Sequence, residues 1–407
     1  MAAPIRVGAP LSGPAFHEIR RAMELDHQKW DTQIGDEGTL AEFPLLIDAS
    51  EWRALAEDAE ALARETAAME TELVGRPELH ERLSIAKPLS ALLRPGAAPP
   101  TPAAARVMRF DFHWTDEGWR VSEVNSDVPG GYAEAETFTS LVAAHFPGTR
   151  PAGEPTRALT EAIAKAAGSG VVALLSAPGF LEDHQVIAHI ARRLRDLGVA
   201  AHPCSLHQIR FSGGVATLDA GAFSGPVAAV VRFYQAEWLA ELPARSGFPL
   251  LFAGGRTPVV NPGVAALSES KRLPLVWGSL RTPISAWRRL SPETRDPRDA
   301  PWRDGDDWVL KLAYCNTGDS VAIRGTMKAP AWSRVAWHAR LRPGKWVAQR
   351  RFRPVPVESP RGLVYPCLGV YTVDGRAAGI YGRLSRSLVI SGNAMDAAVL
   401  VADGGTL

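Results

Sequence analysis

The chain has 407 residues, of which 46% are hydrophobic and 22% are charged, the ordinary balance of a globular protein. A domain usually holds about 100–200 residues, so two or three lobes are expected. The net charge of +1 excludes the strongly basic balance that is typical of proteins for nucleic acid or anionic membranes, and neither partner is expected.

Cysteine usage and the N-terminus indicate the compartment. Cys204, Cys315 and Cys367 are odd in number, far apart and in no Cys-x-x-Cys pair. This pattern disfavours a disulfide framework or a zinc site and agrees with a reducing environment. Residues 1–11 contain no apolar segment behind basic residues, and no run approaches the roughly 20 apolar residues of a membrane span. A cytoplasmic protein without a membrane segment is therefore expected.

The first hundred residues are expected to be helical. Segment 16–30 carries apolar residues at helical spacing, and segment 51–73 is rich in Ala and Glu, with Ser50 as its expected N-cap. A third helix is expected at 77–93. The segment 95–102, PGAAPPTP, breaks regular structure and predicts a boundary.

The middle of the chain changes from a hairpin to alternating elements. Strands are predicted at 106–114 and 119–125, followed by a Gly-Gly turn and a helix near 133–145. A strand, a helix and a strand then follow at 171–176, 182–197 and 201–204, which is typical of a βαβ unit. Another buried strand is predicted at 227–233.

The last part is predicted to be rich in antiparallel strands. A helix is expected at 273–290, then a charged, Pro-rich loop at 288–307, and a second helix at 331–340. Five strands are predicted around that helix: 307–313, 320–324, 345–352, 363–373 and 377–384. The coarse class is α/β or α+β with several lobes.

Segment 106–132, RVMRFDFHWTDEGWRVSEVNSDVPGGY, carries the strongest chemical signal. Apolar residues at 108, 110, 112 and 114 alternate with Arg109, Asp111 and His113, which predicts one apolar and one charged strand face. Strict alternation on the return strand places four residues on one face: Trp119, Val121, Glu123 and Asn125.

The turn between the two strands sets their register. The residues DEG at 116–118 suit a three-residue hairpin loop with glycine in the left-handed conformation. Such a loop pairs Thr115 with Trp119 and, further along, Asp111 with Glu123. Directly opposite residues have Cβ atoms roughly 4.5–5.5 Å apart, so these two carboxylates are expected to be neighbours.

Two neighbouring carboxylates repel each other and need a compensating cation. The same register places Arg109 opposite Asn125, so Arg109 is one such cation and a divalent metal is the other. Oxygen ligands from Asp, Glu and Asn side chains suit Mg²⁺. An ordinary hairpin with a solvated charged face is the alternative, and a register slip of one residue would put the two acids on opposite faces.

The pattern Arg109-Phe110-Asp111, then Glu123-Val124-Asn125 and a loop with Pro and Gly, resembles the metal-binding hairpin of the glutathionylspermidine-synthase-like branch of the ATP-grasp superfamily. In that branch the hairpin precedes the two nucleotide lysines, and this chain has the same permuted order. The resemblance implies a multi-lobed ATP-grasp-like fold, with an antiparallel sheet forming the nucleotide cleft and a βαβ pre-ATP-grasp-like lobe.

The resemblance also divides the chain into four regions. A helical N-terminal region would cover 1–100, and the hairpin part of the ATP-grasp core would cover 101–150. A βαβ substrate lobe would cover 151–262, and the nucleotide-binding lobe would cover 263–407.

Residue roles follow from the resemblance. Asp111, Glu123 and Asn125 would hold Mg²⁺, and Arg109 would be catalytic, steadying the transferring phosphoryl group or the carboxylate. Five residues would bind ATP: Lys271, Lys311, Gly318 in the loop 316–320, Gln349 and Arg383.

The implied activity is ATP-dependent ligation of a carboxylate to an amine through an acyl phosphate, with ATP and Mg²⁺ required. The partners would be a small-molecule carboxylic acid and an amine. The alternatives are an inactive ATP-grasp-like protein that only binds nucleotide, and an unrelated protein whose hairpin matches by chance. The substrates and the oligomeric state stay open.

Overall fold

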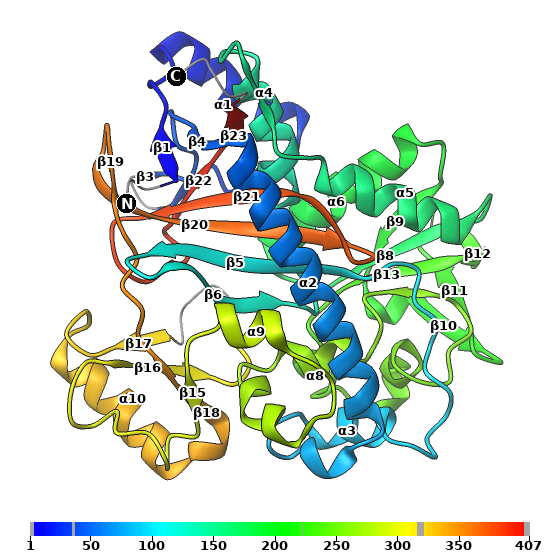
Figure 1. The fold of residues 1–407 in the computed structure, drawn as a ribbon. Coiled ribbons are helices and arrows are strands. Elements are labelled where there is room, and N and C mark those ends of the chain that lie inside the picture. Colours follow the sequence, from blue (N-terminus) through cyan, green and yellow to red (C-terminus); the bar gives the residue numbers. More distant parts are fainter. Residues whose placement is uncertain (1–3, 35–36, 222, 316–320, 403–407) are drawn as a thin grey trace.

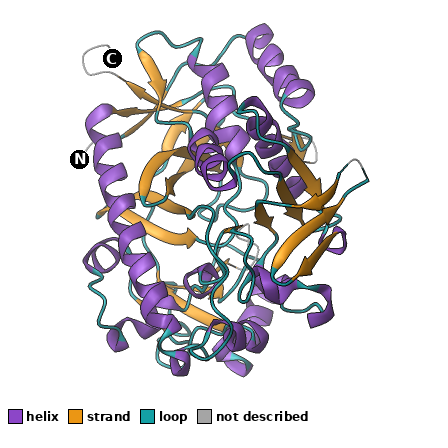
Figure 2. Ribbon diagram, turned by 90° about the vertical axis from the view of Figure 1, so that its right-hand side faces the viewer, coloured by secondary structure: helices purple, strands orange, loops and turns teal. Residues whose placement is uncertain are grey.

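The structure is a computed structural model that describes residues 4–34, 37–221, 223–315 and 321–402. It contains several separate sheets with helices around them, which confirms the mixed α/β class (Figure 1). The long helix α2 (Ala49–Val74) runs across the front of the molecule in Figure 1 and along its left edge in Figure 2. Within the described ranges, no helix combines the length and the apolarity needed to cross a membrane.

The central sheet joins the predicted hairpin to the last strands of the chain. Its strand order is β22-β21-β20-β5-β6, with β19 paired to β20, and every pairing is antiparallel (Figure 1). The strands are β5 (Val107–Thr115), β6 (Gly118–Asn125), β19 (Val357–Ser359), β20 (Gly362–Val373), β21 (Arg376–Ser385) and β22 (Met395–Ala397).

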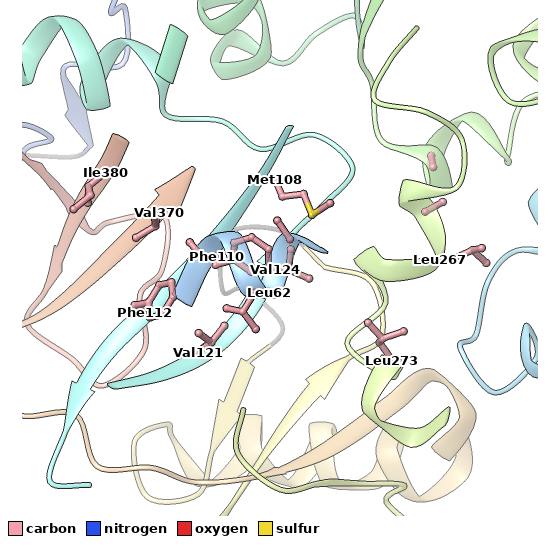
Figure 3. Close-up of a cluster of buried hydrophobic side chains, with 14 of the residues drawn as sticks. Leu62, Met108, Phe110, Phe112, Val121, Val124, Leu267, Leu273, Val370 and Ile380 are labelled. Carbon is pink, nitrogen blue, oxygen red and sulfur yellow. The ribbon is translucent and has the colours of Figure 1, made fainter. Parts of the chain in front are cut away.

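The apolar face of this sheet packs on α2 and forms the largest core. Phe110 and Phe112 are fully buried there, as the alternation in β5 predicted. Figure 3 shows their side chains beside Val121 of β6 and Leu62 of α2. The helix α2 has Asp48, not Ser50, at its N-cap. Because this face is apolar, the charged residues of the hairpin point to the opposite side of the sheet.

A second antiparallel sheet has the order β15-β18-β16-β17. It consists of β15 (Thr294–Arg295), β16 (Trp308–Leu312), β17 (Val321–Ile323) and β18 (Trp346–Arg350), and α10 (Ala329–Leu341) covers one of its faces. Trp302, Trp308 and Leu310 are buried in its core together with Trp346. The other face is turned toward the charged side of the hairpin, and a cleft lies between the two sheets.

A parallel sheet with the order β14-β13-β8-β9 confirms the predicted βαβ unit. Its strands are β8 (Val172–Ser176), β9 (Ala201–Cys204), β13 (Ala229–Phe233) and β14 (Val259–Val260). Helix α6 (Leu181–Asp196) connects β8 to β9 and packs against α5 (Pro155–Ala167), which the sequence pattern did not predict.

The two ends of the chain meet in a fourth sheet, with the order β1-β4-β23-β7. Its strands are β1 (Ile5–Val7), β4 (Leu45–Asp48), β7 (Thr149–Pro151) and β23 (Val399–Ala402). Strands β1 and β4 were not predicted. They are short, and β4 pairs with β23 from the far end of the sequence, so no local pattern indicates the partner.

Three expected helices are interrupted or distorted. The expected helix at 77–93 is wrong as a single element: the chain forms η1 (Pro77–Leu79) and α3 (Lys87–Leu93), with Ser84 at φ 62° between them. The expected helix at 273–290 is η6 (Leu273–Ser279) and α9 (Ser285–Leu290), because Pro283 lies in the break. The helix near 133–145 starts with a π-turn, Glu134–Phe138, and continues as α4 (Thr139–Ala143).

The remaining elements are short. They are α1 (Gly13–Asp26), β2 (Gln33–Ile34), β3 (Glu37–Gly38), η3 (Leu206–Gln208), β10 (Ile209–Ser212), β11 (Val215–Asp219), β12 (Ser224–Pro226), α7 (Ala236–Leu239), η4 (Ala244–Ser246), η5 (Phe248–Leu251), α8 (Ala265–Glu269) and η7 (Pro343–Lys345).

Candidate active site

The hairpin β5–β6 has the predicted register at the site but not at the turn. Asp111 lies opposite Glu123, and Arg109 lies opposite Asn125. At the turn, however, Thr115 pairs with Gly118 rather than with Trp119, so the expected three-residue loop is wrong. The two observations agree because a bulge between them, at Ser122, shifts the pairing by one residue.

The bulge also changes which face each residue of β6 occupies. Strict alternation would place Trp119 and Val121 on the same face as the metal-ligand candidates. In the structure Val121 is fully buried in the apolar core and Trp119 packs against that core. Glu123 and Asn125 face the cleft side. Because of this one extra residue, Trp119 and Val121 face the core before the bulge, and Glu123 and Asn125 face the cleft after it.

Asp111 is the most heavily bonded side chain of the site. Its Oδ1 accepts from Arg109 Nε at 2.8 Å, and its Oδ2 accepts from Arg383 at 2.8 Å and from Asn125 Nδ2 at 3.1 Å. Burial alone would raise the pKa of the Asp111 carboxyl, but the charges of Arg109 and Arg383 hold it below its usual value. Asp111 is therefore ionised at neutral pH.

Arg109 is fixed from several sides. Its NH1 donates to the carbonyl oxygen of Gly130 at 2.8 Å, and its guanidinium carbon lies 5.3 Å from the ring centroid of Tyr381 and 6.0 Å from that of Tyr371. The space for this arrangement comes from Gly369, which lies opposite Asp111 on β20. A Cβ at position 369 would come within 2.7 Å of Arg109 Cδ.

Glu123 is paired with a cation from a distant segment. Its Oε2 lies 3.3 Å from Lys271 Nζ, and that ammonium group also donates to the carbonyl oxygen of Cys315 at 2.9 Å. Burial raises the pKa of Glu123, but the charges of Lys271 and Lys311 outweigh it and keep the pKa below its usual value. Glu123 and Lys271 are therefore both ionised.

Lys311 reaches the hairpin from the second sheet. Its Nζ donates at 3.1 Å to the carbonyl oxygen of Ser122, the extra residue of the bulge. A bulge leaves backbone groups outside the regular ladder, so this carbonyl is available to the lysine. The pKa of Lys311 is lowered, first by burial, while the carboxylate of Glu123 opposes that shift.

The hairpin offers a set of oxygen donors for a divalent metal. Among the described residues, no three His, Cys, Asp or Glu side chains are grouped as a metal site. Asp111, Glu123 and Asn125 supply two carboxylates and one amide. Mg²⁺ takes only a few such oxygen ligands from a protein when nucleotide phosphates and water complete its shell. Asn125 now presents its amide nitrogen to Asp111, and rotation of the amide presents its oxygen instead. This donor set fits Mg²⁺ with a bound nucleotide.

The cleft between the two antiparallel sheets has a volume of about 80 Å³. Five candidates from both sheets line it: Asp111, Glu123, Lys311, Gln349 and Arg383. Apolar side chains also line it, among them Val309, Ile323, Phe352, Leu388 and Ile390. A cleft lined by both charged and apolar groups matches a ligand with a polar head and a flat apolar part. The expected phosphate-loop residue Gly318 lies outside the described residues.

A larger cavity of about 630 Å³ adjoins this cleft. Glu123 and Arg383 line both of them, while Arg109 and Asn125 line the larger cavity. Its wall also contains residues of the parallel-sheet lobe and, from the N-terminal part, Lys29, Asp31, Ile34 and Thr39. The candidate site is therefore the junction of two chambers, with the hairpin between them.

Several residues of the site carry no signal in the sequence. The side-chain oxygen of Asn261 accepts from the backbone N–H of Val107, and its Nδ2 donates to the carbonyl oxygens of Val107 at 2.8 Å, Ser126 at 3.0 Å and Asp127 at 2.9 Å. Glu269 accepts from the backbone N–H of Asp127 at 2.8 Å. Together they fix the loop that leaves Asn125. Their partners are more than 130 positions away in the sequence, so no local pattern indicates these contacts.

Two antiparallel sheets enclose a cleft; one carries the acidic strand pair and the other carries the lysine strand. This arrangement defines an ATP-grasp-like protein. The chain belongs to the glutathionylspermidine synthase preATP-grasp family, which it matches over residues 20–398. This match confirms the resemblance to the glutathionylspermidine-synthase-like branch.

Among the solved structures that this chain resembles, one has a TM-score above 0.5 and supports the fold. A glutathione synthetase-like effector from Globodera pallida, in its apo form, has a TM-score of 0.61 at 14% identity, covering 95% of this chain and 96% of that chain. A putative γ-glutamylcysteine synthetase from Methylobacillus flagellatus KT has a TM-score of 0.37 at 13% identity, covering 79% and 84%. D-alanyl-alanine synthetase A from Vibrio cholerae has a TM-score of 0.34 at 10% identity, covering 57% and 88%. No curated protein matches the sequence.

Proposed function

We propose that this protein is an ATP-dependent ligase that joins a small carboxylic acid to an amine through an acyl phosphate. The observation that carries the proposal is the gathering of Asp111, Glu123 and Asn125 beside Lys271 and Lys311 at the junction of the two chambers. Family membership supports the reaction class, since ATP-grasp proteins typically use ATP and Mg²⁺.

The two chambers divide the substrates. ATP would occupy the cleft between the antiparallel sheets, with its phosphates toward Lys311 and Arg383 and its adenine toward Gln349 and the apolar side chains of the lining. The acid and the amine would enter the larger cavity, where Arg109 lies in the wall. Glu123 and Arg383 line both chambers, so the reacting groups would meet at these two residues.

The first step is transfer of the γ-phosphoryl group to the substrate carboxylate. A carboxylate oxygen attacks the γ-phosphorus, the bond to the bridging oxygen breaks, and an acyl phosphate and ADP result. Mg²⁺, when held by Asp111, Glu123 and Asn125, would neutralise phosphate charge during this transfer. Arg109 and Lys311 would offset negative charge on the substrate carboxylate and the transferring group.

The second step forms the amide bond. The neutral amine attacks the acyl carbon, the carbon–oxygen bond to the phosphate breaks, and the nitrogen loses a proton as phosphate leaves. An acyl phosphate hydrolyses easily, so water must be kept away from it. Arg109 and Asp111 are almost completely buried, which supports a protected reaction centre. Use of ATP and the three free cysteines agree with the cytoplasm as the compartment.

The test measures ADP and phosphate release with Mg²⁺, a panel of acids and hydroxylamine as the acceptor. Asp111→Asn and Glu123→Gln should each lower release by roughly 100-fold or more, because the transferring phosphoryl group loses its charge-neutralising site. Glu117→Gln is the matched control, since Glu117 lies on the same hairpin in an exposed turn.

Three outcomes separate the alternatives. Release that depends on acid, acceptor and Mg²⁺ supports the ligase. Nucleotide binding without release under any combination indicates an inactive nucleotide-binding protein. Release that survives in both acid variants overturns the assignment of the site.

A further inference from the structure

The larger cavity is strongly acidic. Three cationic side chains line it: Lys29, Arg109 and Arg383. Eight carboxylates line it: Asp31, Glu123, Glu134, Glu182, Asp183, Glu237, Glu241 and Asp396. Glu123 belongs to the proposed metal site, and Asp31, Glu134 and Asp396 surround Lys29, so Asp183, Glu237 and Glu241 are left to face a ligand.

Lys29 has no role at the proposed reaction centre and is already paired with carboxylates. Lys29 Nζ lies 2.7 Å from Glu134, 2.9 Å from Asp31 and 3.1 Å from Asp396. Three carboxylates share one ammonium group that is almost fully buried. Lys29 therefore has no capacity for a further anion.

The other two cations belong to the reaction centre. Arg109 and Arg383 both pair with Asp111, and among the described residues neither forms an ion pair with a second carboxylate. A metal ion that binds Asp111 would free these two guanidinium groups for the transferring phosphoryl group and for one carboxylate. The sequence outside the described ranges adds no cationic side chain, because segments 1–3, 35–36, 222, 316–320 and 403–407 contain no Lys, Arg or His.

The opposite wall offers hydrogen-bond acceptors that have no partner. Gln235 is 7% exposed, and its buried Oε1 accepts no hydrogen bond in the described part of the chain. The buried Oδ2 of Asp183 is likewise unpaired. Burial, together with the charge of Glu182, raises the pKa of Asp183 to about 7. Such acceptors favour a ligand that brings hydrogen-bond donors.

Aromatic side chains border these acceptors. Phe180 and Trp238 stack with their ring centroids 4.7 Å apart, and both line the cavity. Glu237, the neighbour of Trp238, is also in the wall, and burial together with Asp127 raises its pKa to about 7. Acceptors beside aromatic faces are suited to an organic ammonium group.

We infer that the acid substrate carries a single carboxylate, the reacting one, and presents an ammonium group to the wall formed by Asp183, Gln235 and Glu237. The inference rests on the proposed ligase function and narrows its substrate class to amino acids without a second carboxylate. A dicarboxylic acid would bring its second charge to a wall of carboxylates where no cation is available, and such mismatched charges select against a ligand.

The experiment compares acids in pairs of equal chain length: β-alanine with succinate, 4-aminobutyrate with glutarate, and 5-aminovalerate with adipate. Hydroxylamine, which is uncharged at the assay pH, is the acceptor throughout, so that only the charge of the acid changes. The amino member of a pair should have a kcat/KM for ADP release roughly 100-fold above that of its dicarboxylate. A dicarboxylate that is used as well as its amino partner, or better, overturns the inference.

Substitutions that replace an acid of the cavity wall by lysine test the effect of its charge. Asp183→Lys should favour the dicarboxylates by roughly tenfold or more relative to the amino acids, because it supplies the missing cation. Asp196→Lys is the matched control, since it lies at the other end of α6 and does not line the cavity. Glu241→Lys repeats the test at an exposed position if Asp183→Lys fails to fold.

Calorimetry separates this inference from the ligase proposal. If no acid releases ADP, the proposed function fails, and binding of the same pairs in the presence of Mg²⁺ and a non-hydrolysable ATP analogue decides the inference alone. Tighter binding of the amino members supports it. Tighter binding of the dicarboxylates, or no binding of any amino member, overturns it.

Discussion

Tyr381 lies beneath both guanidinium groups of the site. Its ring centroid is 5.3 Å from Arg109 and 5.5 Å from Arg383, and its hydroxyl donates to Asp396 at 2.5 Å. Asp396 in turn is held by Lys29. Two like charges that share Asp111 repel each other, and an aromatic face between them offsets that repulsion. Tyr381 is thus a positioning residue for the two arginines.

Two substitutions at Tyr381 separate the ring from the hydroxyl. Tyr381→Leu should lower kcat by roughly 100-fold with little change in the KM for ATP, because two cation–π contacts of about 1–2 kcal/mol each are lost. Tyr381→Phe keeps the ring and should lower kcat by less than tenfold. Steady-state kinetics with saturating acid checks both. Equal losses in the two variants would assign the effect to the hydroxyl and remove the role of the ring.

A buried histidine makes the stability of the fold sensitive to acid. His189 on α6 contacts Thr156 at 3.2 Å through Nε2, and its Nδ1 has no partner among the described residues. Burial, and then the charge of Arg193, lowers the pKa of His189 to about 3. The folded protein therefore resists protonation that the unfolded chain accepts at about pH 6.5.

The sign of the effect follows from proton binding. Between pH 6.5 and 3 the unfolded chain binds more protons at this residue, so the free energy of unfolding falls as the pH falls. The contribution lost between pH 6.5 and pH 5 is about 2 kcal/mol. Urea unfolding at pH 7 and pH 5 should show a smaller decrease for His189→Gln than for the unchanged protein. The same decrease in both would exclude His189 as the cause.

At the scale of elements, the hairpin shows what a sequence pattern can and cannot specify. Alternation on β5 predicted the buried face of Phe110, and counting from the turn placed Asp111 opposite Glu123. The prediction assumed a wrong pairing at the turn, and the extra residue at Ser122 shifted the register by one so that the pairing of Asp111 with Glu123 was still right. No local pattern indicates this bulge. A bulge is selected by the packing on both faces, here by Trp119 and Val121 in the core.

The predictions of two continuous helices were wrong for a related reason. Periodicity predicted helices at 77–93 and 273–290, but Ser84 at positive φ and Pro283 interrupt them. Their apolar residues are periodic because they face a core, even though the backbone turns. Contacts between distant segments, such as Asn261 with Val107, depend on the completed fold and were not predictable from spacing.

A glycine on β20 creates the space for the arginine–aspartate pair. Gly369 pairs with Asp111, and a Cβ there would lie 2.7 Å from Arg109 Cδ and 3.0 Å from Asp111 Oδ1. Gly369→Ala should therefore displace both side chains and lower turnover by roughly tenfold or more, while the core below the sheet stays intact. Turnover and circular dichroism together test this.

The control for Gly369→Ala is Gly344→Ala, where an added Cβ meets nothing within 4 Å. This variant should keep both its turnover and its circular dichroism spectrum. If Gly369→Ala also kept full turnover, Arg109 and Asp111 would tolerate displacement, and the tight geometry of the pair would lose its proposed importance.

At the scale of the whole molecule, the candidate site joins segments from most of the chain. The central sheet contributes residues near 111 and 383, the second sheet contributes Lys311 and Gln349, and the segment after α8 contributes Lys271. Helix α2 packs against the central sheet and against α8 and α9, so it links the lobes behind the site. A ligand in the cleft would therefore contact segments from both sheets and stabilise their association.

This arrangement predicts a metal-dependent stabilisation by nucleotide. A non-hydrolysable ATP analogue at 100 times its Kd should add about 2.7 kcal/mol to the free energy of unfolding, which corresponds to a rise in Tm of about 3 °C for a chain of this length. Because Asp111 is a proposed ligand of Mg²⁺, Asp111→Asn should lose the part of the rise that depends on Mg²⁺, while Glu117→Gln should keep it. Thermal unfolding with and without a chelator measures both. A rise of equal size in the chelator, or one that Asp111→Asn leaves unchanged, would mean that the nucleotide binds without a metal at this hairpin, and the carboxylates would then need a structural explanation as partners of Arg383 and Lys271.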